Sequence, residues 1–327
     1  MVDFIDQMRH ERSIPVERTC QALSEAGMKF TSRAYRAAKT RPASKRCVRD
    51  GQIIKVLEGL RSPDRFGRLA PESMYGVRKM WRWLQLNGFP NIARCTVERL
   101  MRKLGMKGLV RGKGTVTTKA SKTAKRAPDL LNRDFNTDRP NAVWVTDFTY
   151  VPTWNGWCYV SLVIDLFARM ILGWAVSTSK DVSFVEDALQ MATWTRDQEG
   201  HSLPVGLDPD DENRVIHHSD AGSQYTALRY TDTIELEGLR PSIGTVGDAY
   251  DNAEAESVMG LYKHEAVRKD SPFRTGPLKN RDDVEAVTLD WVNWYNTKRL
   301  HSKIGYLPPQ EAENQYYQNS SKQSAAA

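Results

Sequence analysis

Cysteine is scarce in this chain, and its four cysteines stand far apart. Cys20, Cys47, Cys95 and Cys158 form no C-x-x-C pair, whereas disulfide scaffolds and zinc knuckles need closer spacing. The sequence therefore predicts reduced, mostly buried thiols and no zinc site. Reduced thiols are typical of cytosolic proteins, in which disulfides are rare.

Long apolar runs are lacking as well. No stretch reaches the roughly 18 consecutive apolar residues that a membrane-spanning helix needs. The opening segment, MVDFIDQMRHERS, does not have the basic and then apolar order of a secretory signal. We therefore expect a cytoplasmic protein without a membrane partner.

Charge is abundant but unevenly divided along the 327 residues, a length that suffices for two or three domains. Residues 1–135 carry 30 Lys and Arg against 12 Asp and Glu, whereas residues 136–327 carry 17 against 28. The net charge is +18 in the first part and −11 in the second. A basic arm joined to an acidic body predicts that the arm holds a polyanion and that the body has another task.

Residues 1–70 combine basic side chains with short helical patterns. One helix is expected over 16–26. A second, capped by Thr31 or Ser32, is expected to end before Pro42. The spacing of these two helices suits a helix-turn-helix, although the apolar period is weak, and we describe the segment as a basic helical N-terminal region.

A stronger helical pair is predicted within residues 71–110. Apolar residues recur at helical spacing over 75–86, and the sequence Asn-Gly-Phe-Pro then breaks the helix. A second, basic helix is expected over 94–104. Helix, short turn and basic helix is the layout that places a recognition helix in the DNA major groove. A helical hairpin with a solvated basic face is the alternative. The candidate DNA contacts are Arg94, Arg99, Arg102 and Lys103.

Residues 111–135 are expected to form a basic linker. Arg111 and Lys113 lie in the stretch 105–128, which contains no acidic residue. Such a segment is suited to following DNA phosphates, with affinity gained by counterion release. A solvated tether without DNA contacts is the alternative.

From residue 136 the pattern becomes that of a mixed α/β domain. Three β-branched or aromatic runs, at 144–151, 156–165 and 170–178, predict consecutive antiparallel strands, and Asn155-Gly156 is a hairpin signal. We expect a five-stranded mixed sheet covered by helices over 136–300, then a C-terminal extension, 301–327, that ends in disorder. The remaining expected elements are helix 183–198, strand 214–217, helix 224–237, strand 241–245 and helices 252–268 and 281–298.

Three carboxylates of this domain are candidates for a metal site. Asp147 interrupts an apolar strand, which is costly unless the charge is paired or binds a cation. Asp220 follows the fourth strand, at the end where α/β sheets present ligand groups. Glu256 begins a helix after 35 further residues. Because the first and fourth strands of such a sheet are usually neighbours, we expect the three carboxylates to meet. Each of them alone would more often be a salt-bridged or solvated residue.

Carboxylates alone suit a hard cation such as Mg²⁺. Two such ions can activate the attacking oxygen and stabilise the leaving oxygen of a phosphodiester displacement. Lys263 and Asn252 are expected on the same helical face as Glu256 and are candidates for contacts with DNA. For Lys263, simple exposure to solvent is the alternative. His217 and His218 point to opposite faces of a strand, so we expect one in the core and one lining the site.

The segments around these residues resemble a known family. The chain is similar over nearly its whole length to the second-frame (OrfB-type) DDE transposases of two-frame bacterial insertion sequences, which are related to retroviral integrase cores. YGVRKMWRWL with CTVERLMRKLG resembles the family's helix-turn-helix, and WYNTKRLHSKIGYLPPQEAE its C-terminal signature. The strongest matches are WVTDFTYV around Asp147, VIDLFARMILGW at 163–174, HHSDAGSQY around Asp220, and YDNAEAES with LYKHE around Glu256 and Lys263.

This resemblance implies a ribonuclease H-like fold and a site for two Mg²⁺ ions, or Mn²⁺ in their place, held by Asp147, Asp220 and Glu256. It implies cleavage at the ends of the element to free a 3′-OH, which then attacks target DNA without a covalent protein–DNA intermediate. The expected active form is a dimer or larger assembly at the bacterial nucleoid. The family's active protein is usually a frameshift fusion with an upstream helix-turn-helix and leucine zipper, so the upstream-frame protein is a further expected partner.

Two other functions stay open on the sequence. A ribonuclease H-like nuclease would share the metal site but would not join DNA. The basic residues 1–135 favour a transposase, because strand joining requires two DNAs to be held together. A non-catalytic DNA-binding repressor from a decayed element is the second alternative, against which the three intact carboxylates argue.

Overall fold

The computed structural model describes residues 1–110, 127–204, 207–208, 211, 213–220, 222, 224–225, 227–244 and 252–326. The chain divides into two compact units, Met1–Val56 and Leu57–Ala327. Most of the expected basic linker, with Arg111 and Lys113, lies outside the described residues. Among the residues described, no helix combines the length and the apolar character needed to cross a membrane.

The first unit is built from the helices α1 (Val2–Arg12), α2 (Val16–Glu25) and α3 (Ser32–Thr40). Its small core contains Ile5, Cys20, Leu23 and Tyr35. Two of its three helices are those predicted, whereas α1 was not, because its apolar residues follow no clear helical period.

Local signals explain where α2 and α3 end and begin. Gly27 has a φ of +83°, a conformation that favours glycine and closes α2. The hydroxyl of Thr31 accepts a hydrogen bond from the backbone N–H of Ala34 at 3.1 Å, which caps α3 as predicted. The helix that follows, α4 (Lys45–Gly59), reaches into the second unit.

The predicted helical pair is present as α5 (Val77–Leu86) and α6 (Arg94–Lys103), after a 3-10 helix, Pro71–Met74. The apolar faces of both helices are buried, at Met80 and Leu84 of α5 and at Val97, Leu100 and Met101 of α6.

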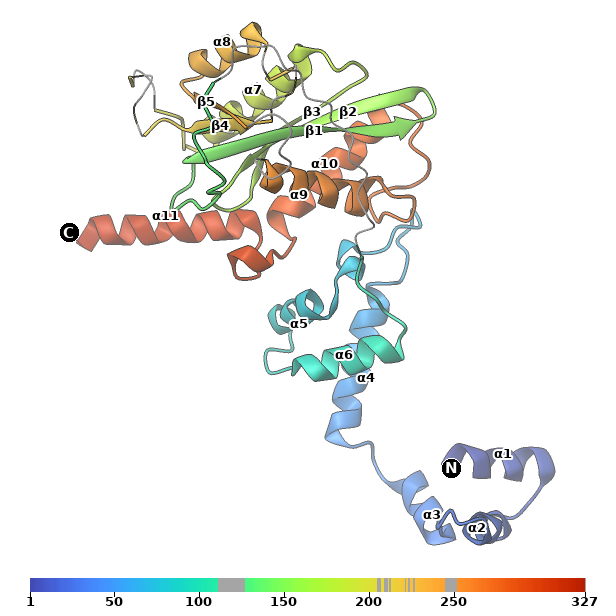
Figure 1. Cartoon of the computed structure of the whole chain (residues 1–327). Helices are drawn as coiled ribbons and strands as arrows, with labels where there is room; N and C mark the ends of the chain where they lie inside the picture. Colours follow the sequence, from blue (N-terminus) through green and yellow to red (C-terminus); the bar gives the residue numbers. More distant parts are fainter. Residues whose placement is uncertain are drawn as a thin grey trace. The chain divides into compact units, whose positions relative to one another are not determined.

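The core of the second unit is a five-stranded sheet with the strand order β3-β2-β1-β4-β5 (Figure 1). β1 is antiparallel to β2, and β2 to β3, whereas β4 is parallel to both β1 and β5. The predicted mixed sheet is therefore confirmed. The strands are β1 (Val143–Thr153), β2 (Gly156–Asp165), β3 (Ile171–Ser177), β4 (Ile216–Ser219) and β5 (Arg240–Ile243).

Helices cover both faces of this sheet. α7 (Val182–Gln198) and α8 (Leu228–Leu236) lie on one side, and α9 (Ala253–Tyr262) and α10 (Arg281–Thr297) on the other (Figure 1). A short π-helix, Lys263–Val267, continues α9.

Alternation along β1 decides which side each residue faces. Trp144 and Phe148 pack in the core beneath α7, together with Phe184. Asp147 therefore points to the opposite side, where α9 contacts β1. The close packing of α7 on the sheet depends on Gly173 of β3, where a Cβ would lie 2.1 Å from the carbonyl oxygen of Ala188.

Two expectations about the chain were wrong. The C-terminal residues are not disordered but form α11 (Pro309–Ala326). Tyr316 packs edge-on against Phe167, with ring centroids 5.0 Å apart, and Tyr317 stacks on His201 with centroids 3.7 Å apart. These contacts with residues far away in the sequence hold α11 in place, although most of its residues are polar. The thiols, all free, are only half buried as a set, since Cys47 and Cys95 are exposed.

Candidate active site

Parallel pairing brings Asp147 and Asp220 to the same end of two neighbouring strands. The pairing of β1 with β4 ends at Val145 opposite His218. Asp147 and Asp220 each lie two residues beyond that pair, one still on β1 and the other just after β4. The predicted adjacency of the first and fourth strands is thus confirmed.

The Asp220 carboxylate is held by the turn that follows β4. Its Oδ1 accepts a hydrogen bond from the backbone N–H of Gly222 at 3.0 Å. A Cβ at Gly222 would lie only 2.9 Å from that oxygen. Glycine at position 222 therefore leaves enough space for the Asp220 carboxylate, which a larger side chain would displace.

Glu256 lies in the first turn of α9, which is tied to β1 beside Asp147. The side-chain amide of Asn252 donates a hydrogen bond to the carbonyl oxygen of Thr146 at 2.9 Å. Asn252 in turn accepts a hydrogen bond at its backbone carbonyl from the N–H of Glu256, at 3.1 Å. Asn252 is buried, and its side chain holds the start of the helix against the strand.

The three carboxylates influence one another's ionisation. Burial raises the pKa of Asp147 well above its ordinary value, and the negative charges of Asp220 and Glu256 raise it further. The pKa of Asp220 is raised by burial, and that of Glu256 by burial and by the charge of Asp220. Like charges in a desolvated region resist joint ionisation, so a cation placed among them would be stabilised.

The side chains at this site have the oxygen atoms that a hard divalent cation prefers as ligands. All the acidic ligands offered are oxygens, as Mg²⁺ prefers, and the side-chain oxygen of Asn252 is buried without a hydrogen-bond partner. Within the described part of the chain, no three His, Cys, Asp or Glu side chains already lie close enough to share one ion.

Lys263 lies near the carboxylates, on the helical continuation of α9. Its positive charge lowers the pKa of Asp147, against the effect of burial. Its Nζ is 5.5 Å from the centroid of the Tyr150 ring, on the same strand as Asp147. The ammonium is therefore close enough to act on the charge of Asp147.

That one strand histidine lines the site stays a prediction. His217 and His218 are both buried, and His218 is close enough to Asp220 to lower the pKa of that carboxyl, against the effect of burial. His217 pairs with the Tyr230 hydroxyl at 3.2 Å, and burial lowers its pKa to about 3. His218 Nδ1 lies 2.8 Å from the hydroxyl of Ser242.

The four basic candidates on α6, which are Arg94, Arg99, Arg102 and Lys103, are all exposed. Arg102 forms an ion pair with Glu98 at 3.0 Å, one helical turn away. Exposed pairs of this kind contribute little to stability, so this side chain can exchange its partner for a phosphate at small cost.

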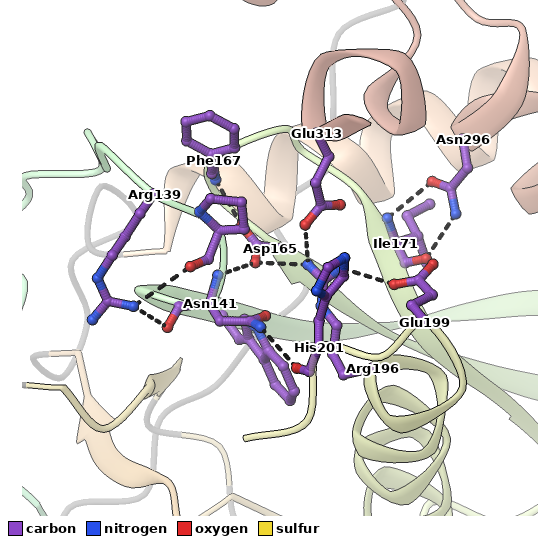
Figure 2. Close-up of polar contacts among 12 residues, drawn as sticks. Arg139, Asn141, Asp165, Phe167, Ile171, Arg196, Glu199, His201, Asn296 and Glu313 are labelled. Atoms are coloured by element: carbon purple, nitrogen blue, oxygen red, sulfur yellow. Dashed lines mark hydrogen bonds and ion pairs between the residues drawn. The ribbon is translucent and has the colours of Figure 1, made fainter. Parts of the chain in front are cut away.

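A charged cluster that the sequence did not reveal lies at the end of β2 (Figure 2). The guanidinium of Arg196 is fully buried and binds Asp165 at 3.0 Å, Glu313 at 2.7 Å and Glu199 at 2.9 Å. Asp165 also accepts a hydrogen bond from Asn141 N–H at 2.7 Å. These contacts join β2, α7 and α11. The only signal in the sequence was Asp165 at the end of an apolar strand.

A second cluster fixes the first turn of α9. Glu254, two residues before Glu256, forms ion pairs with Arg169 and Lys303. Arg169 lies in the turn between β2 and β3 and has a φ of +62°, which is unusual for a residue with a side chain. Two distant segments thus meet at the helix that carries Glu256.

Comparisons with known proteins agree with this architecture. Residues 137–249 and 237–309 match two family models described as integrase core domain, and residues 68–114 match one described as HTH-like domain. A putative transposase for insertion sequence element IS986/IS6110 of Mycobacterium tuberculosis is 44% identical over 277 residues, 85% of this chain and 92% of the relative. The transposase for insertion sequence element IS629 of Shigella sonnei is 47% identical over 244 residues, 75% of each chain.

Among solved structures, the catalytic core domain of HTLV-2 integrase in complex with magnesium covers 54% of this chain and 98% of its own, at 10% identity and a TM-score of 0.38.

Proposed function

The chain belongs to the insertion-sequence transposases with an integrase core domain, and on that premise we propose that it cleaves DNA at the ends of its element and transfers the freed 3′-OH into target DNA. Both steps are phosphodiester displacements, one by water and one by a DNA hydroxyl. The placement of Asp147 and Asp220, each two residues beyond the last pair of the parallel strands β1 and β4, carries the proposal.

In this proposal Asp147, Asp220 and Glu256 bind two divalent ions, Mg²⁺ or Mn²⁺. The chemistry that such ions supply is activation of the attacking oxygen and stabilisation of the leaving one. Lys263 holds a phosphate oxygen of the reacting strand beside the carboxylates. Asn252 acts as a positioning residue, because its amide is already engaged with the backbone of β1.

The division of the chain follows the same logic. We assign DNA recognition to residues 71–110, where the exposed cations of α6 lie, and catalysis to residues 136–300. The basic residues 1–70 and 111–135 add affinity for phosphates, and 301–327 form a C-terminal extension. Strand joining requires two DNAs at once, so the proposed active form is a dimer or larger assembly on chromosomal DNA in the cytoplasm, with the upstream-frame protein as a further partner.

A strand-transfer reaction tests the proposal. Labelled DNA carrying the element's own ends is incubated with protein and Mg²⁺, in parallel with the Asp147→Asn variant. Joined product from the unsubstituted protein alone supports a transposase with this metal site. Cleavage without joining would indicate a nuclease, and binding without chemistry in either protein would indicate a DNA-binding repressor.

A further inference from the structure

The β1–β2 hairpin extends beyond the rest of the sheet (Figure 1). The two strands pair up to Thr153 opposite Gly156, joined by a two-residue turn. β4 pairs with β1 only as far as Val145, and β3 pairs with β2 no nearer to the turn than Tyr159. The outer end of the hairpin is therefore a ribbon of two strands within the part of the sheet that the structure describes.

The tip of this ribbon is held in place by backbone contacts. The N–H groups of Trp154 and Asn155 donate hydrogen bonds to the carbonyl oxygens of Leu278 and Lys279, at 3.1 and 3.0 Å. These bonds satisfy the turn and anchor it to the segment before α10. A fixed tip presents its side chains without the entropy cost of ordering a loose loop on binding.

Two tryptophans of this tip are exposed to solvent. Trp154 in the turn is 71% exposed, and Trp157 at the start of β2 is 57% exposed. Large aromatic side chains are normally buried for most of their area. Two of them on one anchored turn indicate a surface that is covered by a ligand.

A continuous path joins this tip to the carboxylates. The ring of Trp157 meets that of Tyr150 edge-on, with centroids 6.1 Å apart. Lys263 lies over the same tyrosine at 5.5 Å, and its charge also acts on Asp147. Tyr150 is three residues after Asp147 on β1, roughly 10 Å along the strand and on its opposite face, so Lys263 is the group that links the aromatic tip to the carboxylates.

We propose that Trp154 and Trp157 form a stacking platform for unpaired bases of the DNA strand next to the reacting phosphate. The platform rests on the proposed function, because it needs that phosphate at the carboxylates and at Lys263. Aromatic rings beside a cation are the chemistry with which proteins bind single-stranded nucleic acid without regard to sequence. The faces of paired bases are covered by their neighbours in a duplex, so stacking selects bases that have been opened.

Protein association is the competing use of exposed tryptophans. Lys263 favours nucleic acid, because its ammonium lies over the Tyr150 ring and also acts on Asp147, where the proposed function places the reacting phosphate. A contact between the tryptophans of two copies of the chain would instead appear in the test as a change in sedimentation.

The test uses the full chain in EDTA, so that no chemistry occurs. The probe is a DNA duplex with a three-base single-stranded flank that carries 2-aminopurine, compared with the same duplex fully paired. The unsubstituted protein is expected to bind the flanked DNA more tightly and to quench its fluorescence. Trp154→Ala with Trp157→Ala is expected to weaken binding of the flanked DNA about tenfold or more, to abolish the quenching and to leave the paired duplex unaffected.

Trp194→Ala is the matched control, since Trp194 on α7 is 59% exposed but lies outside the hairpin. Trp154→Phe with Trp157→Phe should keep most of the preference, because phenylalanine still stacks. Thermal unfolding of each variant checks that the hairpin substitutions leave the fold intact.

Equal weakening on both DNAs, or no change on either, would overturn the platform. A change in sedimentation with undiminished binding of the flanked DNA would also overturn it and would identify a protein interface. If the protein quenches the 2-aminopurine fluorescence but does not join DNA, the proposed function is contradicted and the stacking platform is supported. If the protein joins DNA but the double alanine substitution leaves binding of the flanked DNA unchanged, the platform alone is contradicted.

Discussion

The side-chain amide of Asn252 donates a hydrogen bond to the carbonyl oxygen of Thr146, the residue that precedes Asp147. This bond links the start of α9 to the strand that carries the first carboxylate, across 106 residues of sequence. Glu256 lies one helical turn beyond Asn252, so this buried amide helps to set the position of one carboxylate relative to the other, together with the ion pairs of Glu254.

Asn252→Asp should therefore disrupt catalysis without disrupting DNA binding. The substitution removes the N–H donor and sets a carboxylate against the Thr146 carbonyl oxygen, and leaving that buried acceptor unpaired costs about 1–3 kcal/mol. We expect strand transfer to fall at least about tenfold, since 1.4 kcal/mol corresponds to a factor of ten. Asn132→Asp, at an exposed position, is the control. Undiminished strand transfer by Asn252→Asp would show that the bond does not position Glu256.

Removing one negative charge from the carboxylate set should stabilise the metal-free protein. The pKa of Asp147 is raised by burial and by the charges of Asp220 and Glu256, so its ionised form is unfavourable in the folded state. Asp147→Asn is expected to raise the melting temperature in EDTA, by roughly 2–4 °C for each kcal/mol gained. Mg²⁺ should raise the melting temperature of the unsubstituted protein and not that of the variant.

The matched control for this measurement is Asp138→Asn, at an exposed residue outside the site. It should change neither the melting temperature in EDTA nor the response to Mg²⁺. A lower melting temperature for Asp147→Asn in EDTA would contradict the repulsion inferred from the pKa values.

The attachment of α11 should weaken as the pH rises toward neutrality. Burial raises the pKa of Glu313 to about 7, although the adjacent Arg196 opposes the shift. The folded state thus retains a proton that the unfolded chain has released, and the resulting stability is complete below about pH 4.5 and is lost as the pH rises through 7. Thermal unfolding between pH 5 and pH 8, with Glu313→Gln for comparison, measures this contribution. The glutamine variant should lose the pH dependence in that window, and an unchanged profile would contradict the assignment.

The cations of α6 should contribute to DNA affinity through phosphates. Replacing Arg99 or Lys103 with alanine is expected to weaken binding on all DNA sequences alike. The slope of log affinity against log salt should fall by about one for each phosphate that the replaced side chain neutralised. Lys322→Ala, an exposed lysine of α11, is the control. If no substitution in α6 changes the salt dependence of binding, α6 is not part of the DNA interface.

Local patterns explain the parts of the fold that could be predicted. The strands at 144–151 and 156–165 were recognisable because apolar residues and a turn signal lie within one short segment, and the structure has them as β1 and β2. The positions of Asp147 and Asp220 at neighbouring strand ends followed from the order of the elements. In contrast, α11 was missed because its anchor, Glu313, finds Arg196 only in three dimensions.

The same limit applies to the surroundings of the candidate site. The contact between the ring of His218 and the hydroxyl of Ser242, on a strand 24 residues away, could not be predicted from the sequence. Likewise, nothing near Glu254 in the sequence indicates that Arg169 and Lys303 hold it. Side-chain partners of this kind depend on tertiary packing, which a periodic pattern does not contain.

The pairing of β1 with its two neighbours has a consequence for how the protein folds. β1 and β2 are joined by a two-residue turn, so that their contact closes a very short loop, whereas Val145 must find His218, 73 residues later. Contacts between distant residues form slowly because a long loop has to close first. Asp147 is therefore expected in its place on a hairpin before Asp220 arrives beside it. The appearance of metal binding during refolding would then mark the late closure of the sheet, well after most secondary structure has formed.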